Sequence, residues 1–361
     1  MKILGLGGIL KDAACAIVAD GHLAAAVEEN KVARHWTHGT LPHAAIEACL
    51  HAAKVSPAEV DCVAVARPLR TGPGLHMQLR AQFPNARLAV IEHQAAHAAS
   101  AFYLSGFGEA TVLTLDRSGD FRCGARYHGK GPRLQLETEY YFPDSLADLY
   151  SRVTELLGFH GGADEHKVQW LSAAGSDRFV PLFRDLLLTD SARLNPAYFD
   201  AGRVGHGGFG ERFYEALGLE DGDPIPEKLR ADVAHGVQRS IEEKVIELAG
   251  EGENLCLAGG LFYNALLVNA IEQSGRFKNV FVQPVAGNAG TAIGAALHAW
   301  YNVRRSDQAI APWDLFLGPS YAAEEIKKVL ENCKLRFRYL TSDELIAEAI
   351  EHLRNDQIIA W

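Results

Sequence analysis

The chain has 361 residues, of which 48% are hydrophobic, so its length and composition favour a two-lobed or two-domain globular protein over a disordered one. Acidic residues (45) outnumber basic residues (35), and the formal net charge of −10 argues against nucleic acid or an anionic membrane as a partner. No apolar run approaches the roughly 18 residues of a membrane span. The six cysteines are scattered without a CxxC pair, which predicts reduced thiols in a cytoplasmic protein.

The N-terminal part of the chain begins with three short apolar runs separated by turns. These runs predict strands at 2–6, 14–18 and 23–27. Asp20-Gly21, between the second and third runs, is a strong hairpin signal. The next predicted elements are a helix at 42–53, strands at 60–66 and 88–91, and a second helix at 93–102. The predicted order is therefore three strands followed by alternating helices and strands.

The same order recurs in the second part of the chain. Strands are predicted at 111–115, 122–127 and 134–140, with turns at 117–120 and 129–131. The elements predicted after them are an amphipathic helix at 229–249, a strand at 255–258, a helix at 261–273, a strand at 280–283 and a helix at 288–301. A β-β-β-α-β-α unit that occurs twice predicts the α/β fold of actin, the heat-shock chaperone ATPases and the sugar kinases, in which two lobes flank a nucleotide cleft. A Rossmann fold, the main alternative, lacks its GxGxxG turn here.

This repeat sets the expected domain boundaries. We expect a first lobe over 1–105, a second lobe over 106–318 with an insertion at about 176–228, and the start of a C-terminal region over 319–361. The insertion contains a glycine-rich run at 204–210, but it lacks the Lys-Ser/Thr end and the following helix of a phosphate loop. An ordinary surface insertion is therefore the favoured interpretation.

Two histidines, His93 and His97, stand four residues apart in a run of small, helix-forming residues. Because residues four apart share one face of a helix, the spacing places the two imidazoles close enough to share a metal ion. Asp116 closes a predicted strand just before a glycine turn, where α/β proteins place catalytic groups, and it is the candidate third ligand. The alternative is a chance pair on a solvated helix face, since the chain has 15 histidines.

Two glycine-rich turns each join a predicted strand to a predicted helix in the second part. The first contains Gly259 and Gly260 and leads to Asn264, and the second contains Asn288. Glycine lets backbone amides approach a ligand closely, and a helix N-terminus favours an anion or the polar edge of adenosine. The two turns favour a ligand site over a role restricted to packing and capping.

Taken together, these motifs resemble those of the nodulation-type and antibiotic-tailoring O-carbamoyltransferases, which are related to the hydrogenase-maturation carbamoyltransferases and to the tRNA threonylcarbamoyl transferase. The matching runs are 12–16, 28–34, 93–102, 115–119, 149–150, 165–168, 257–264 and 283–290. The resemblance extends from the first residue to the last. It implies an actin-like domain that binds carbamoyl-adenylate and an Fe(II)-type divalent metal, and that passes the carbamoyl group to a small-molecule hydroxyl acceptor.

The resemblance also assigns roles to individual residues. The family's metal ligands fall on His93, His97 and Asp116, and its fourth ligand, an aspartate, falls on Asn288. A neutral amide is a poorer ligand for a divalent metal, so the affinity should fall or the metal should change. The family has His-Asp where this chain has Lys11 and Asp12, which makes these two the candidate catalytic residues.

The remaining predicted contacts concern the nucleotide. Its binding is expected to involve Ser118, Gly119, Gly259, Gly260, Asn264 and Asn288, with Asp116 beside them. Lys11 or Lys167 would neutralise the leaving phosphate, although Lys167 is equally compatible with an ion pair to Asp164 or Glu165. Closure of the two lobes would exclude water from the adenylate.

In the family, a Gly-Trp pair leads into a second domain that makes the adenylate from ATP and carbamoyl phosphate. Here the predicted helix at 343–354 and the predicted strand at 358–361 start a unit that they do not finish, and the sequence stops at Ala360-Trp361, so we expect a fragment. We expect its adenylate-forming domain, with Mg²⁺, to act in cis or in trans, and the chain could form a homodimer. Two alternatives remain: an actin-like ATP-dependent phosphotransferase, and a nucleotide-binding module with a degenerate metal site, the latter motivated by Lys11 and Asn288.

Overall fold

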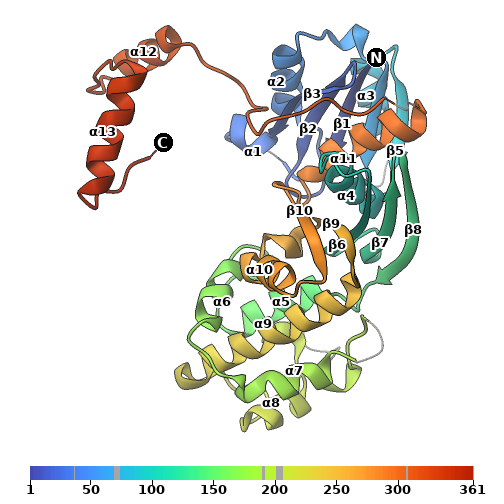
Figure 1. The fold of residues 1–361 in the computed structure, drawn as a ribbon, viewed down its shortest axis with the longest axis vertical. Helices are drawn as coiled ribbons and strands as arrows, with labels where there is room; N and C mark the ends of the chain where they lie inside the picture. The colour runs from blue at the N-terminus through green and yellow to red at the C-terminus, as the bar shows by residue number, and fades with distance from the viewer. Residues whose placement is uncertain (36, 69–73, 189–191, 201–205, 306–307, 361) are drawn as a thin grey trace. The chain divides into compact units, whose positions relative to one another are not determined.

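The computed structural model describes all residues except 36, 69–73, 189–191, 201–205, 306–307 and 361. Residues Met1–Gly318 form one compact unit, and Pro319–Trp361 form a second unit. Both sheets and all the predicted site residues belong to the first unit (Figure 1). In the described part of the chain, no helix is both long and apolar enough to cross a membrane.

The first sheet has the strand order β3-β2-β1-β4-β5. Its strands are β1 (Lys2–Gly7), β2 (Ala14–Ala19), β3 (His22–Glu28), β4 (Cys62–Ala66) and β5 (Arg87–Ile91). β1, β2 and β3 pair antiparallel as a meander, whereas β4 pairs parallel with both β1 and β5. The parallel strand β4 is buried along its whole length, as its continuous apolar run requires.

The second sheet repeats this topology as β8-β7-β6-β9-β10. Its strands are β6 (Glu109–Gly119), β7 (Arg122–Lys130), β8 (Arg133–Tyr141), β9 (Gly252–Ala258) and β10 (Phe277–Val282). Again the first three strands pair antiparallel, and β9 pairs parallel with β6 and β10. The predicted duplicated β-β-β-α-β-α architecture is confirmed.

Helices cover both faces of the first sheet. On one face, Leu4 and Leu6 pack with α2 (His43–Ala53) and α3 (Gly74–Gln82). On the other face lies α11 (Gly290–His298), which follows the last strand of the second sheet in sequence. A Cβ on Gly5 would lie 2.1 Å from the carbonyl oxygen of Ala292, so the absence of a side chain lets α11 contact the sheet directly. The segment 106–318 thus contributes a helix to the first lobe.

The second sheet is covered on one face by α5 (Leu146–Leu156), α9 (Glu227–Ala249) and α10 (Ala265–Gln273), which share one large apolar core. α7 (Val180–Leu186) and α8 (Glu211–Leu217), from the predicted insertion, join the same core through Phe183 and Phe213. Phe209, Phe213 and Phe183 form a row of ring contacts there. The described part of the insertion is therefore packed structure and not only surface loop. Residues 204 and 205 of the glycine-rich run lie outside the described residues.

The opposite face of the second sheet packs against α4 (His93–Phe102), which also packs against α11. Gly294 of α11 makes this close approach possible, because a Cβ there would lie 1.7 Å from the carbonyl oxygen of Ala96. α4 and α11 therefore lie next to each other between the two sheets (Figure 1). This contact fixes the helix that carries the histidine pair against both lobes.

Three local predictions differ from the structure. β6 continues through the predicted turn at 117–120 to Gly119, with an irregular register between Leu115 and Gly119, and the chain reverses at Asp120 and Phe121, which both have positive φ. The predicted helix at 261–273 begins with a separate 3-10 turn, Gly260–Tyr263, before α10. The predicted strand at 358–361 does not form at 358–360, and residue 361 lies outside the described residues.

The second unit, considered by itself, contains α12 (Ala323–Asn332) and α13 (Ser342–Arg354). α13 begins with a capping box, in which Thr341 and Glu344 satisfy each other's backbone amides. Both helices carry exposed apolar residues, namely Ile326, Val329, Leu345, Ile346, Ile350 and Leu353.

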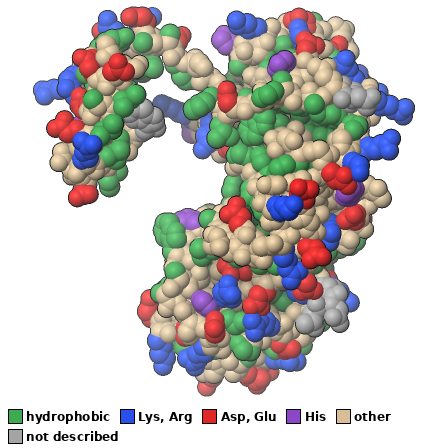
Figure 2. Space-filling model, in the orientation of Figure 1, with side chains coloured by type: hydrophobic (Ala, Val, Ile, Leu, Met, Phe, Trp, Pro, Cys, Tyr) green, Lys and Arg blue, Asp and Glu red, His purple; other side chains and the backbone are tan. Residues whose placement is uncertain are grey.

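In the first unit, acidic and basic side chains are interspersed over the face drawn in Figure 2.

Candidate active site

α4 places both histidines in the interior of the protein. Glu92 is the N-cap residue, His93 is the first residue of the helix, and His97 follows one turn later. Their exposed fractions are 3% and 0%. The alternative of a solvated helix face is therefore excluded by burial. The two rings meet edge to face, with their centroids 4.7 Å apart.

The irregular stretch of β6 brings Asp116 to the histidines. Its Oδ2 lies 2.7 Å from Nε2 of His93 and 3.5 Å from Nε2 of His97. One ligand atom from each of the three residues lies within 4.8 Å of the others. The Asp116 side chain is also fixed locally, because its Oδ1 accepts a hydrogen bond of 2.8 Å from the Arg117 amide. The predicted triad therefore converges at one point.

The ring of His93 is held from three sides. Its Nδ1 lies 2.8 Å from the carbonyl oxygen of Arg67, and its Nε2 faces Asp116. Its third neighbour is Gly119, where a Cβ would lie 2.0 Å from the ring carbon Cδ2. Because a carbonyl oxygen only accepts, Nδ1 must carry a proton. A neutral His93 would then turn the lone pair of Nε2 toward a carboxylate, so this geometry requires either a second proton or a cation.

The pKa values of the triad follow from this arrangement. Burial by itself would lower the pKa of His93, but the hydrogen bond and negative charge of Asp116 outweigh burial and raise it. Burial lowers the pKa of His97, an effect that the neighbouring His93 reinforces and Asp116 only partly offsets. Burial opposes ionisation of Asp116, but the two imidazoles hold the pKa of its carboxyl well below the usual range. At neutral pH, His97 is therefore a neutral imidazole beside an ionised carboxylate.

The donor set suits a divalent metal ion. His97 is fully buried, and in the described part of the chain neither of its ring nitrogens has a hydrogen-bond partner. A buried polar group without a partner is costly, and a metal ion would supply one. Two imidazoles and one carboxylate that leave positions open are the ligands of many non-haem Fe(II) sites. The residues present therefore fit the predicted metal, and Asp116, His93 and His97 would hold it.

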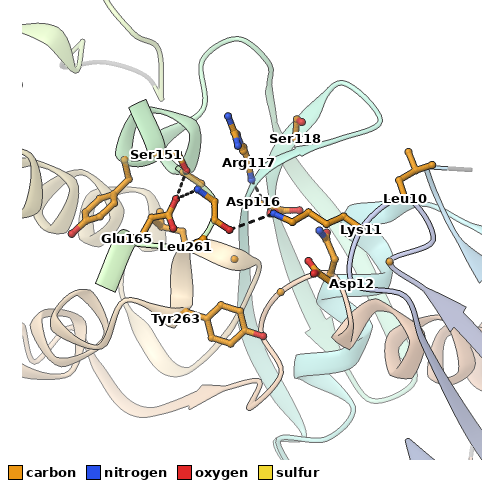
Figure 3. A pocket seen from close by; sticks show the side chains of 18 of the residues that line it. Leu10, Lys11, Asp12, Asp116, Arg117, Ser118, Ser151, Glu165, Leu261 and Tyr263 are labelled. Carbon is orange, nitrogen blue, oxygen red and sulfur yellow. Dashed lines mark hydrogen bonds between the residues drawn. The ribbon is translucent and has the colours of Figure 1, made fainter. Parts of the chain in front are cut away.

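A cavity of about 520 Å³ opens beside the triad. It is lined by the β1–β2 turn, by His93 and Asp116, by the loop that contains Gly162, and by the two glycine-rich turns (Figure 3). Most predicted site residues contribute to this lining, namely Lys11, Asp12, Asp116, Ser118, Gly260, Asn264 and Asn288. Groups from both lobes therefore face one space of the size of a small-molecule site.

Three residues predicted to bind the nucleotide lie outside this lining. The amide of Gly259 already donates a 2.7 Å hydrogen bond to Ala286, and a Cβ there would lie 2.1 Å from the carbonyl oxygen of Leu115. At Gly119, the ring of His93 fills the space that a side chain would need. Lys167 forms an ion pair of 2.9 Å with Asp164, which is the alternative that the sequence left open for it.

Asn264 lines the cavity, but other residues of the protein already bind its side chain. Its Oδ1 accepts from the amide of Leu267 and so caps α10, and its Nδ2 donates 2.8 Å to Gln238 Oε1. Gln238, at 2% exposure, also accepts from the Tyr150 hydroxyl at 2.8 Å and donates to Glu242. This network fixes the side chains of Asn264 and Tyr150, which both line the cavity.

Several lining residues were not predicted from the sequence. They are Arg67, Arg117, Tyr150, Ser151, Glu165 and Tyr263. Ser151 in α5 and Glu165, the first residue of α6 (Glu165–Ser172), come together, with 2.7 Å between the Ser151 hydroxyl and Glu165 Oε1. Arg117 carried a local signal as the neighbour of Asp116 in the predicted turn, and Tyr150, Glu165 and Tyr263 lie in runs that carry the family resemblance. Arg67 and Ser151 carried neither signal and reach the cavity through tertiary packing.

The cavity belongs to a fold with solved relatives. Component A of (R)-2-hydroxyglutaryl-CoA dehydratase from Acidaminococcus fermentans aligns with a TM-score of 0.51 at 16% identity, over 84% of this chain and 99% of its own. HypF from T. kodakarensis aligns with a TM-score of 0.50 at 14% identity, over 86% of this chain and 49% of its own. Both matches support the actin-like fold.

Sequence relatives cover nearly the whole chain. An uncharacterised protein of Synechocystis sp. is 30% identical over 99% of this chain and 68% of its own length. Nodulation protein NolNO of Sinorhizobium fredii is 27% identical over 98% of this chain, and nodulation protein NolO of Bradyrhizobium diazoefficiens is 29% identical over 75%. The chain spans about half the length of these two nodulation proteins, 55% and 50%.

The family profile described as carbamoyltransferase N-terminus matches residues 75–297, which include the histidine pair, Asp116 and both glycine-rich turns. With this match and the Synechocystis relative, the chain belongs to the carbamoyltransferase family.

Proposed function

We propose that the chain transfers a carbamoyl group from carbamoyl-adenylate to the hydroxyl group of a small molecule, with a divalent metal ion, Fe(II) or a similar one, held by His93, His97 and Asp116. The observation that carries this proposal is the buried triad, of which His93 and Asp116 line a cavity of about 520 Å³, and which lies within the segment that matches the carbamoyltransferase family. When bound, the metal would supply Lewis-acid stabilisation of the donor.

The chain's own residues have distinct tasks in this proposal. The cavity lining at Ser118, Gly260 and Asn288 binds the adenylate. Gly260 lies beside the triad, because a Cβ there would lie 3.3 Å from Asp116 Oδ1, so a side chain at this position would occupy donor space. Asn288 lies in the same lining, and its backbone carbonyl anchors the start of α11 by accepting from Thr291.

The acceptor reacts from the side of the β1–β2 turn, where Asp12 lines the cavity. Asp12 accepts the proton of the acceptor hydroxyl while the hydroxyl oxygen of the acceptor attacks the carbamoyl carbon. The bond between that carbon and the phosphate oxygen breaks, and AMP leaves with the bond's electron pair. Lys11, next to Asp12, contributes a positive charge at the entrance. Enclosure by two lobes limits attack by water.

The donor itself would come from an adenylate-forming unit that uses ATP, carbamoyl phosphate and Mg²⁺, joined to this chain or separate from it. The decisive experiment therefore supplies carbamoyl-adenylate ready-made. With a small hydroxyl compound present as the carbamoyl acceptor, we expect the Fe(II)-loaded chain to accelerate AMP release, and we expect His97→Leu to abolish the acceleration. His298→Leu is the matched control, because His298 is a partly buried histidine that belongs neither to the triad nor to the cavity lining. Equal rates for His97→Leu and the parent chain would refute the proposal.

A second test uses Asn288, where the family resemblance expects a carboxylate. Asn288→Asp should raise the affinity for Fe(II) by roughly tenfold or more, because an anionic oxygen binds a divalent cation better than an amide does. Asn254→Asp is the control, since Asn254 bonds Glu109 and Asn279 on the outer part of the second sheet. Titration calorimetry under anaerobic conditions measures both. An unchanged affinity in Asn288→Asp would place residue 288 outside the metal's coordination sphere.

A further inference from the structure

Two cationic side chains from different lobes converge on Gly162 in the cavity wall. Lys11, in the β1–β2 turn, places Nζ 3.4 Å from the carbonyl oxygen of Gly162 (Figure 3). A Cβ on Gly162 would lie 3.3 Å from Lys11 Nζ and 3.6 Å from Nη1 of Arg117, which belongs to β6. Both cations therefore approach the same side of this glycine, and all three residues line the cavity.

These cations are incompletely neutralised by the protein. In the described part of the chain, no carboxylate oxygen lies within 4.0 Å of Lys11 Nζ. Arg117 donates 2.8 Å from Nε to Asp148, but the same carboxylate also accepts 2.7 Å from Nε of Arg152. One buried carboxylate thus serves two guanidinium groups, and about half of the Arg117 side chain (49%) is exposed.

Two carboxylates in the cavity lining, those of Glu165 and Asp12, form no ion pair with either cation. Glu165 lines the cavity, but its Oε1 already accepts from the hydroxyl of Ser151 and from the amide of Gly162. Asp12 follows Lys11 in the turn and forms no ion pair with it. A pair of cations at an exposed entrance, on a chain with a net charge of −10, is a local feature that attracts an anion.

We propose that Lys11 and Arg117 form an anion-binding subsite for an acidic group, a carboxylate or phosphate, that is carried by the acceptor substrate. This inference rests on the proposed function. An ammonium and a guanidinium group that face one point provide the charge-assisted donors that such a group prefers. Because Asp12 is the neighbour of Lys11, an acceptor held by its acidic group would present a hydroxyl beside the residue proposed to accept its proton.

The donor phosphate is the other possible source of an anion, and a binding experiment separates the two. Inorganic phosphate is titrated into the chain by calorimetry, first alone and then with AMP at saturation. We expect phosphate to bind in both cases, because the subsite is distinct from the position of the donor phosphate. Lys11→Gln and Arg117→Gln should each weaken phosphate binding by roughly tenfold and reduce its salt dependence. AMP affinity should fall less than phosphate affinity in both variants, because the proposed subsite is distinct from the position of the donor phosphate.

Lys130→Gln is the matched control, because Lys130 is exposed on β7, pairs with Glu109 and lies outside the cavity lining. Phosphate binding that is unchanged in both cavity variants would overturn the subsite, and so would the absence of phosphate binding to the parent chain. Displacement of phosphate by AMP would assign these cations to the donor and overturn the acceptor assignment. Failure of AMP to bind at all would instead count against the proposed function, since the phosphate titration alone still reports on the subsite.

Discussion

Oδ2 of Asp116 lies 2.7 Å from Nε2 of His93, and both residues are buried. The opposite ring nitrogen of His93 is bound by a backbone carbonyl, so the pair cannot form a simple hydrogen bond between a neutral imidazole and a carboxylate. A proton or a metal ion must therefore lie between the lone pair of His93 Nε2 and the negatively charged carboxylate of Asp116. This relationship makes the site sensitive to both pH and metal.

The first prediction separates metal binding from stability at His97. In the absence of metal, the ring nitrogens of His97 form no hydrogen bond in the described part of the chain, and Asp116 Oδ2 lies 3.5 Å from Nε2. His97→Leu should therefore lower the free energy of unfolding by no more than about 1–2 kcal/mol. Its affinity for Fe(II) should fall by roughly two orders of magnitude or more, because one of three protein ligands is lost. Urea denaturation and anaerobic calorimetry measure the two quantities. A large loss of stability with intact metal affinity would show that His97 serves packing alone.

The second prediction concerns the pH dependence of metal binding. The pKa of His93 lies above its ordinary value of 6.5, so this residue is mostly protonated at pH 6 and must lose a proton when a metal ion binds. The affinity for Fe(II) should therefore rise with pH from 6 upward until the folded pKa of His93 is passed. Close to one proton should be released per ion at pH 6, which calorimetry in buffers of different ionisation enthalpy detects. A flat affinity profile across this range would contradict the assignment.

The same residues predict the acid stability of the metal-free chain. Asp116 has a depressed pKa, so its contribution to stability is present above the unfolded value of about 4 and is lost as the pH falls through the folded pKa. His93 has a raised pKa, so its contribution is present below about 6.5 and is lost as the pH rises through the folded value. Asp116→Asn should remove both trends, which urea midpoints measured from pH 3 to 8 would show.

The third prediction tests the fit of His93 against β6. A methyl group at Gly119 would lie 2.0 Å from the imidazole, so Gly119→Ala must displace the ring. We expect a loss of about 1–3 kcal/mol in stability and a marked fall in metal affinity. Gly108→Ala is the control, because a Cβ at Gly108 meets no atom within 4 Å and its stability should change by less than about 0.5 kcal/mol. If Gly119→Ala binds metal as tightly as the parent chain, the observed position of the His93 ring is not required for metal binding.

The fourth prediction concerns the network below the cavity. Gln238→Met conserves shape but leaves the Tyr150 hydroxyl, the Asn264 amide and the Glu242 carboxylate each without one partner. The free energy of unfolding should fall by about 1–3 kcal/mol, because buried polar groups lose hydrogen bonds. Gln273→Met, at an exposed position near the end of α10, should have little effect. Equal urea midpoints for the two variants would show that the network is not needed for stability.

The sequence by itself determined the features that depend on local periodicity. The spacing of His93 and His97 fixes both imidazoles on one helical face, and apolar runs between glycine turns fix the repeated order of strands and helices. The predicted Asp116 is a third local case, because a polar residue after a buried strand marks the strand's functional end. Each of these patterns involves residues that are close in sequence, so it does not depend on how the two lobes are arranged.

Only the tertiary structure decided which of these local features meet. α11 crosses to the first sheet and packs on α4 because Gly5 and Gly294 allow backbone contact, and nothing in the local pattern of 288–301 specifies that partner. In the same way, Arg117 and Lys11 meet at Gly162, which is 151 positions from Lys11 in the chain. Such contacts are set by the packing of whole helices on sheets, so the composition of either segment alone does not contain them.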